Sequence, residues 1–89
     1  MKLTLSDLKR YRRMTNAERN NDPIKEEIYD RMRWMPEKWR RIVKVRYIER
    51  RSVAYTCMEL HIGKTTYLRR TKELAEWLED TEKYLREQV

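Results

Sequence analysis

The chain has 89 residues, of which 39% are hydrophobic and 42% are charged, so it has room for one modest core and none for a second domain. Its single cysteine and single histidine exclude an internal disulfide and the usual zinc cluster of four Cys and His ligands, and neither a bilayer-spanning apolar run nor a signal-peptide pattern is present. The net charge of +7 is typical of proteins with a polyanionic partner.

The first two predicted elements are helices, because one glycine and two prolines leave little from which to build hairpins. The first should begin at Ser6, an N-cap followed by acidic Asp7, and run to about residue 15 or 19. A second should cover about 23–34, since Asp22 is a good N-cap and Pro23 suits the first helical position. An apolar stripe at helical spacing supports this second helix: Ile24, Ile28, Met32 and Met35.

The third predicted helix spans about 36–50, because the residue before Pro36 avoids helical geometry while a proline opens a helix well. Its buried side should carry Trp39, Ile42, Val43, Tyr47 and also Val45, and its outward side Arg40, Arg41, Lys44 and Arg51. The stretch VKVRYI, residues 43–48, also alternates as a half-exposed strand does. We favour the helix, since no glycine turn is available to pair such a strand.

The second half of the chain predicts two more helices. Ser52 should cap one over 53–60, and Gly63 should end the loop that follows. The last helix is long, from about 64 to 86, and its apolar side carries Tyr67, Thr71, Leu74, Leu78 and Leu85, with Ala75 and Trp77 beside them. The whole chain is therefore predicted to be all-α, a small bundle of four to five helices.

Residues 52–72 satisfy the demands of a helix-turn-helix, in which two helices cross near a right angle and the second enters the major groove of DNA. Close crossing needs a small residue in the middle of the first helix, where we expect Cys57. The turn needs a residue with a left-handed backbone, a role that we assign to His61. Leu60 and Ile62 should pack into the core on either side of this turn.

The same residues carry a family resemblance. The segment SVAYTCMELHIGKTTYLRRTKELAEWL, residues 52–78, resembles the helix-turn-helix of bacterial sigma-70 region 4, and PEKWRRIVKVRYIERRS, residues 36–52, resembles that family's lead-in helix. Small phage regulators of late genes, of the ArpU and RinA type, look like free-standing versions of this module preceded by extra helices. The resemblance implies a phage or prophage transcriptional regulator that acts in a bacterial cytoplasm, at the nucleoid.

The chain is expected to form one compact domain with two parts. Residues 35–89 would be the sigma-like unit, and residues 1–34 would be N-terminal helices that support it or mediate homodimerisation. No cofactor is implied, and no constellation of residues supports enzyme activity.

The expected DNA-binding residues gather around the start of the last helix, because the first turns of a recognition helix reach base edges first. Those expected at bases are Lys64, Thr65, Leu68, Arg69 and Lys72. Those placed for phosphates are Ser52, Tyr55, Thr66 and Arg70, with Arg51 and Lys44 as outer electrostatic anchors. Residues 1–51 carry 16 Lys or Arg against 8 Asp or Glu, whereas residues 73–89 carry 2 against 6, so the end of the chain should point away from a phosphate backbone.

Simpler interpretations of these residues stand beside the functional ones. His61 could serve as a base or metal ligand and Cys57 as a reactive thiol, but the chain offers no second histidine to join them, so a turn residue and a small buried residue are favoured. The sequence GKTT lacks the upstream glycine of a phosphate-binding loop, because that position is Met58. The cations of the first three helices can equally form only a solvated face.

Two rival functions are compatible with the same fold. A DNA-packaging component such as a small terminase subunit also carries a helix-turn-helix, but usually adds an oligomerisation region. A module that docks on RNA polymerase or a sigma factor would use Trp34, Trp39 and Tyr47 as anchors instead of reading DNA. Double-stranded DNA is the first partner expected, and polymerase or sigma factor the second.

Overall fold

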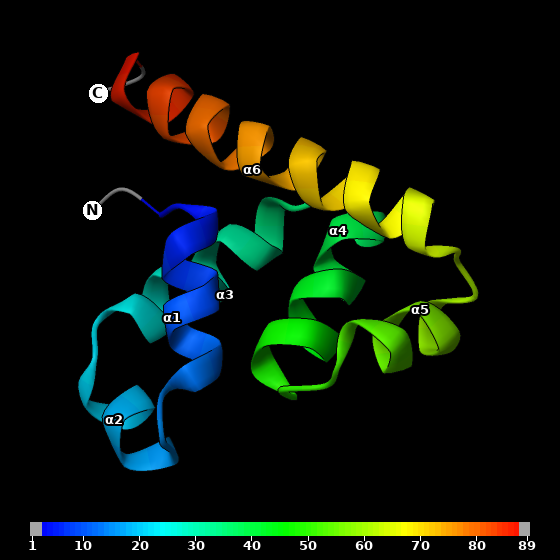
Figure 1. The fold of residues 1–89 in the computed structure, drawn as a ribbon. Helices are drawn as coiled ribbons and strands as arrows, with labels where there is room; N and C mark the ends of the chain where they lie inside the picture. The colour runs from blue at the N-terminus through cyan, green and yellow to red at the C-terminus, as the bar shows by residue number, and fades with distance from the viewer. Residues whose placement is uncertain (1–2, 88–89) are drawn as a thin grey trace.

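The described part of the chain is entirely helical. The computed structural model describes the backbone of residues 3–87 and the side chains of residues 3–80, and contains no strand within them. Six α-helices and one π-helix follow in the order α1 Leu5–Arg13, α2 Asn16–Asn21, α3 Ile24–Trp34, α4 Glu37–Ile42, η1 Val43–Ile48, α5 Val53–Leu60 and α6 Lys64–Glu87 (Figure 1). The all-α prediction is confirmed, although the expected four to five helices are too few. None of the described helices is long and apolar enough to cross a membrane.

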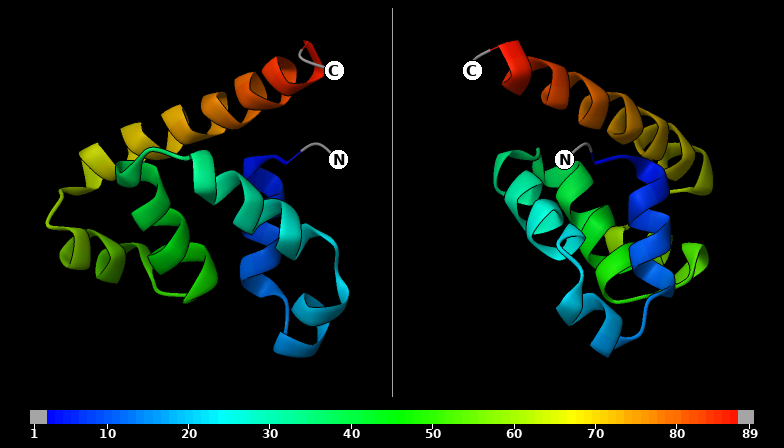
Figure 2. Two further views of the ribbon diagram at one scale, coloured as in Figure 1. Left: turned by 180° about the vertical axis from the view of Figure 1, so that it is seen from behind. Right: turned by 90° about the vertical axis from the view of Figure 1, so that its left-hand side faces the viewer.

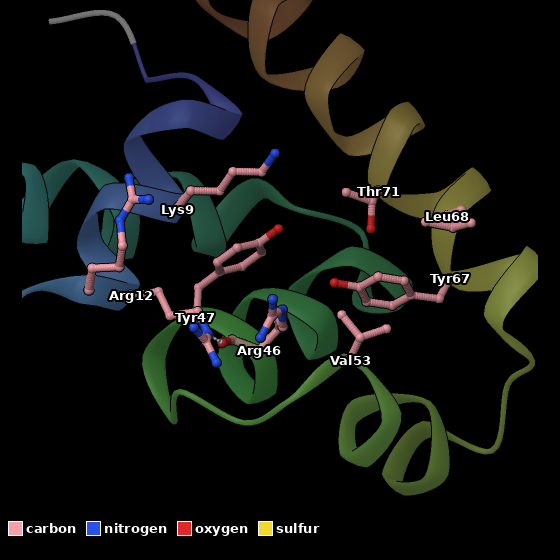
Figure 3. Close-up of a pocket in the computed structure, with 9 residues that line it drawn as sticks. Lys9, Arg12, Arg46, Tyr47, Val53, Tyr67, Leu68 and Thr71 are labelled. Carbon is pink, nitrogen blue, oxygen red and sulfur yellow. Dashed lines mark hydrogen bonds between the residues drawn. The ribbon is translucent and has the colours of Figure 1, made fainter.

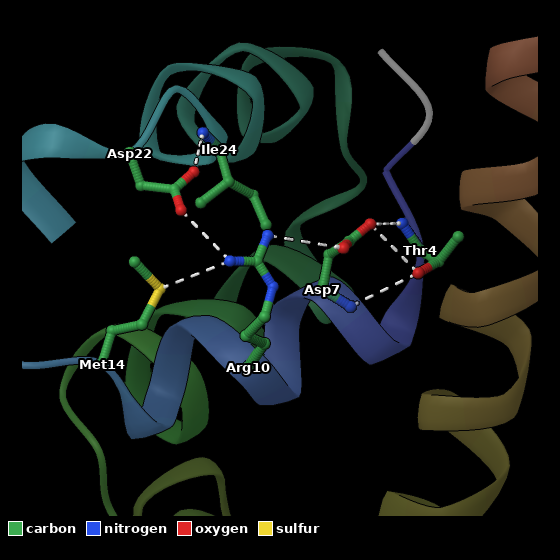
Figure 4. Close-up of polar contacts among 6 residues, drawn as sticks. All are labelled: Thr4, Asp7, Arg10, Met14, Asp22 and Ile24. Carbon is green, nitrogen blue, oxygen red and sulfur yellow. Dashed lines mark hydrogen bonds and ion pairs between the residues drawn. The ribbon is translucent and has the colours of Figure 1, made fainter. Parts of the chain in front are cut away.

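The start of α1 is set by Thr4 and not by Ser6, which corrects the expected N-cap. The Thr4 hydroxyl accepts from the Asp7 N–H at 3.3 Å, and the Asp7 carboxylate accepts from the Thr4 N–H at 2.9 Å (Figure 4). This reciprocal capping box satisfies two backbone donors, whereas a cap at Ser6 would leave Asp7 too close to reach back.

The short helix α2 differs from the sequence prediction, in which the first helix continues to about residue 15 or 19. Instead α1 ends at Arg13, Met14 is extended, and Thr15 caps a new helix. The Glu18 carboxylate accepts from the Thr15 N–H at 3.0 Å, and the Thr15 hydroxyl accepts from the Glu18 N–H at 3.2 Å. The capping-box spacing of Thr15 and Glu18 is visible in the sequence and was the missed signal.

The third helix begins where the sequence predicts, to within one residue. Pro23 already has helical backbone angles, and the Asp22 carboxylate accepts from the Ile24 N–H at 2.9 Å. The other oxygen of Asp22 accepts from Arg10 of α1 at 3.1 Å, so the cap also ties α1 to the start of α3 (Figure 4). Of the predicted stripe, Ile24, Ile28 and Met35 are buried and Met32 is partly buried.

The expected helix over 36–50 is real but changes its winding at Val43. In η1 the Glu49 N–H donates to the carbonyl of Lys44, five residues back, at 2.9 Å. The strand interpretation of residues 43–48 is therefore wrong. Val43, Val45 and Tyr47 are all buried, because η1 contacts both α1 and α5, so that more than one of its faces is covered.

Arginine side chains hold the N-terminal helices against the end of η1. Arg19 donates to the carbonyls of Tyr47 and Ile48, both at 2.8 Å. Arg12 donates to the carbonyls of Arg46 at 3.2 Å and Arg50 at 3.3 Å. Carbonyls at a helix end lack partners within the helix, and these guanidinium groups supply them.

A third arginine, Arg40, also donates to carbonyls at a helix end, contrary to the sequence prediction. Arg40 was expected to point outward, but it is half-buried and donates to the carbonyls of Met32 at 2.9 Å and Met35 at 2.8 Å, at the end of α3. Of the other expected outward residues, Arg41, Lys44 and Arg51 are exposed.

The long helix α6 lies across the remaining helices, as both views of Figure 2 show. It contacts α1, α4 and α5, and its Leu74 and Leu78 are fully buried in one cluster with Ile42 and Val43. Trp77 of α6 packs beside Trp39 of α4, with ring centroids 5.9 Å apart. The predicted stripe of α6 is thereby confirmed as far as Leu78, and Leu85 lies outside the described side chains.

Candidate nucleic-acid interface

The turn between α5 and α6 has the geometry that His61 was expected to provide. His61 is left-handed, with φ 56° and ψ 45°. Its N–H donates to the carbonyl of Met58 at 3.2 Å, and the Ile62 N–H donates to the carbonyl of Cys57 at 3.0 Å. This pair of bonds is a Schellman motif, which satisfies the last carbonyls of α5 and ends the helix.

The packing face of α5 differs from the prediction by one residue. Thr56, not Cys57, is fully buried, whereas Cys57 is half-buried and Ala54 is exposed. Thr56 lies four residues before buried Leu60, so the two share one face of the helix. The Thr56 hydroxyl donates to the carbonyl of Ser52 at 2.8 Å, which allows a polar residue to occupy the core.

The starts of α5 and α6 lie where the sequence predicts them. The Ser52 hydroxyl accepts from the Tyr55 N–H at 3.0 Å and caps α5. The carbonyl of Gly63 accepts from the Tyr67 N–H at 3.0 Å at the first turn of α6. Gly63 does not have positive φ, and a Cβ there would meet nothing within 4 Å, so a Ser or Thr cap would fit equally well.

The first turns of α6 separate a buried side from a basic exposed side. Tyr67 and Leu74 are buried, and Leu68 is 56% exposed. The Arg69 side chain is 66% exposed and lies 3.6 Å from the Glu73 carboxylate, a surface pair one helical turn away that is weak enough to exchange for another anion. The residues expected to reach bases are all exposed: Lys64, Thr65, Leu68, Arg69 and Lys72.

The residues expected at phosphates lie around this surface with varied exposure. Ser52, Arg51 and Lys44 are exposed, while Tyr55 is half-buried beneath the Arg51 guanidinium, 4.7 Å from the ring centre. Thr66 and Arg70 are half-buried on α6. None of the expected DNA-binding residues lies in the core.

An apolar hollow joins α5 to the start of α6. It has a volume of about 460 Å³ and is lined by Val53, Ala54, Cys57, Lys64 and Leu68. The half-buried Cys57 is therefore part of an open surface between the two helices and not of a closed crossing point. The hollow brings the start of α5 and the predicted base-reading side of α6 onto one surface.

Sequence reasoning missed a second cluster of cations beside this surface. A cleft of about 340 Å³ lies between α1, η1, the start of α5 and α6 (Figure 3). We name it the basic cleft, lined by Lys9, Arg12, Arg13, Arg46, Tyr47, Val53, Tyr67, Leu68 and Thr71. Tyr47 is one of these lining residues, and burial, together with the neighbouring Tyr67, raises its pKa above the ordinary value for a phenol. No local sequence pattern could reveal a site whose residues come from four separate elements.

The aromatic residues proposed for protein docking are mostly in the core. Trp39 and Tyr47 are buried, which corrects their assignment as docking anchors, whereas Trp34 is 74% exposed. Among the described residues, no group of three or more His, Cys, Asp or Glu could hold a metal ion.

Comparisons of the chain with models of protein families, with curated proteins and with solved structures found no match. The fold and surface define a small all-α protein in which one long helix carries cations on the exposed side of its first half.

Proposed function

We propose that this protein is a sequence-specific DNA-binding transcriptional regulator in which α5, the turn at residues 61–63 and α6 form a helix-turn-helix. One observation carries the proposal: the side of α6 opposite the core exposes cations and small polar or apolar groups together in its first turns. Acidic residues follow only later along the helix, at Glu73, Glu76, Glu79 and Asp80. Such a helix can enter a major groove with its leading end while its trailing end stays clear of the phosphates.

The geometry of the turn supports this function. Ser52 and Lys64, at the starts of α5 and α6, are both exposed to solvent, and the Schellman turn at His61 connects the two helices. Helix starts carry partial positive charge and unpaired N–H groups, which suit phosphate oxygens. In this arrangement α5 would contact the backbone of the duplex while α6 contacts the bases.

Each exposed side chain then has a role that its chemistry fits. The Arg69 guanidinium can bind a guanine edge through two hydrogen bonds, and Leu68 can contact a thymine methyl group. Lys64, Thr65 and Lys72 would reach neighbouring base edges. The remaining residues would hold phosphates: Ser52, Tyr55, Thr66 and Arg70, with Arg51 and Lys44 at the rim.

The finer assignment rests on the resemblance to sigma-70 region 4. On this ground we propose that the protein is encoded by a phage or prophage, acts at the nucleoid of the bacterial cytoplasm and forms a homodimer through its N-terminal helices. One observation favours a second candidate function, docking on RNA polymerase or a sigma factor, because Trp34 is a large apolar side chain left exposed on α3.

The test begins with selection of a tight-binding duplex from a random library, followed by titration of that duplex and a scrambled one over a salt series. Arg69→Ala should weaken binding to the selected duplex by about 1–3 kcal/mol and change binding to the scrambled one little. Arg51→Ala should weaken both alike and lower the salt slope by about one unit.

If Arg69→Ala and Arg51→Ala weaken binding to the selected and the scrambled duplex in the same way, α6 does not read bases. Binding to polymerase without affinity for DNA, abolished by Trp34→Ala, would select the docking function instead.

A further inference from the structure

The basic cleft gathers positive charge that no carboxylate neutralises. Its cationic lining residues are Lys9, Arg12 and Arg13 from α1 and Arg46 from η1, and no Asp or Glu of the described residues lines it. Four cations that line one cleft repel one another, and a bound polyanion would offset this repulsion.

The four cations divide into two that hold the structure and two that do not. Arg12 and Arg46 donate to backbone carbonyls, Arg46 to that of Arg51 at 2.8 Å. Lys9 and Arg13 are exposed and form no hydrogen bond or ion pair with any described residue. Lys9 extends from α1 toward the α6 side of the cleft (Figure 3). These two side chains are available to a ligand without any loss of internal bonds.

The position of the cleft indicates which polyanion it would meet. Leu68 lines both the basic cleft and the apolar hollow between α5 and α6, and Val53 at the start of α5 also lines both. The cleft therefore continues the surface that would face a duplex. A helix in the major groove, which is about 12 Å wide, has a phosphate backbone along each of its sides.

We propose that the basic cleft binds the sugar–phosphate backbone of the same duplex whose major groove α6 enters, so that α1 contributes Lys9 and Arg13 to DNA binding. This inference rests on the proposed function. The N-terminal helices then act as part of the DNA interface, in addition to supporting the fold. Contacts of this kind add affinity and fix the orientation of the protein but carry no sequence information.

The experiment compares two double variants of the full chain that each remove two positive charges. Lys9→Gln/Arg13→Gln empties the cleft of its unpaired cations. Lys25→Gln/Arg33→Gln removes two charges from α3, where Arg33 lies in a hollow with Glu26, Glu27 and Asp30. Affinities for a labelled selected duplex and for its scrambled counterpart are measured over a salt series, with Arg69→Ala in parallel.

The cleft variant should lower the slope of log K against log salt by about two units, since each phosphate contact contributes about 0.9. It should weaken binding to both duplexes by the same factor, while the α3 variant leaves the slope unchanged. Lys9→Arg/Arg13→Lys, which keeps both charges, should retain the wild-type slope and so separates loss of charge from loss of folding.

The possible failures are distinguishable. If the cleft variant matches the α3 variant while Arg69→Ala still loses selectivity, the cleft does not contact DNA and the proposed function stands. If wild type binds no duplex at all, both proposals fall. A loss confined to the selected duplex would also overturn the inference, because backbone contacts are blind to sequence.

Discussion

The guanidinium carbon of Arg19 lies 4.0 Å from the centre of the Tyr11 ring, and Nε of Arg19 donates to the backbone carbonyl of Tyr11 at 3.0 Å. Arg19 is only 6% exposed, and its remaining nitrogens donate to the carbonyls of Tyr47 and Ile48. Burial, and to a lesser degree the charge of Arg50, lower the pKa of Arg19, yet a guanidinium stays protonated. A buried charge is thus held by a ring face and three carbonyls.

Removal of this guanidinium should destabilise the fold. Arg19→Ala should lower the free energy of unfolding by about 2–4 kcal/mol, because charge-assisted hydrogen bonds are lost and buried carbonyls are left without donors. Arg19→Lys should recover only part of the loss, since one ammonium cannot span the three carbonyls. Chemical denaturation measures both, with Arg13→Ala as the exposed control, expected within about 0.5 kcal/mol of wild type. An Arg19→Ala variant as stable as that control would contradict the role.

The left-handed backbone at His61 predicts opposite effects for two substitutions. His61→Gly should be neutral or stabilising, because glycine adopts positive φ without steric cost. His61→Val should cost about 1–2 kcal/mol, since a β-branched side chain resists this conformation. Thermal melts of the two variants provide the comparison, and a Val variant that melts with wild type would rule out the strain argument.

Two threonines whose hydroxyl groups are buried should respond in opposite directions to the same substitution. The Thr71 hydroxyl is buried and has no hydrogen-bond partner among the described residues, so Thr71→Val should be neutral or stabilise by up to about 2 kcal/mol. The Thr56 hydroxyl donates to the carbonyl of Ser52, so Thr56→Val should destabilise by about 0.5–1.5 kcal/mol. Urea unfolding of both variants tests the difference, and equal destabilisation would show that Thr71 has a partner.

The cap at Asp22 predicts part of the acid sensitivity of the fold. The Ile24 N–H, and then Arg10, hold the pKa of Asp22 below its ordinary value. A lowered folded-state pKa contributes stability that is present above the unfolded value of about 3.9 and is lost as pH falls through the folded value. Asp22→Asn keeps an acceptor for Ile24 but does not titrate. Its stability should therefore fall less than that of wild type between about pH 5 and about pH 2. Denaturation curves measured over this pH range would show whether the two proteins differ. If wild type and Asp22→Asn lose equal stability, Asp22 does not contribute to the acid sensitivity.

Helix boundaries could be predicted wherever a local signal sets them. Pro23 and Ser52 mark starts that the structure confirms, and His61 ends α5 in the expected conformation. The π-helical winding of η1 could not be predicted from the sequence. The carbonyls at its end accept hydrogen bonds from side chains of another helix, such as Arg19, and no local sequence pattern shows these contacts. The burial of Val45, by contrast, agrees with the sequence prediction, and the contacts of η1 with α1 and α5 account for it.

The candidate interface could be predicted only where one helix carries it. The exposed side of α6, with Arg69 and Lys72, follows from periodicity alone. The sequence could not show which basic residues of α1 stabilise the fold and which are free to bind a ligand, because Arg12 and Arg13 are adjacent and chemically identical. Arg12 donates to carbonyls at the end of η1, whereas Arg13 has no partner among the described residues. This difference depends on the path of the backbone in the folded chain.

The arginine contacts at the end of η1 have a consequence for synthesis. Arg12 and Arg19 precede the carbonyls that they bind at the end of η1 by 28 to 38 residues, so a ribosome makes these donors before those acceptors. Both donors are therefore already part of the nascent chain when the last turn of η1 is made, and these contacts require no later part of the chain. The helices that follow, α5 and α6, are made after both partners of these contacts, and α6 then adds Leu74 and Leu78 to the core cluster.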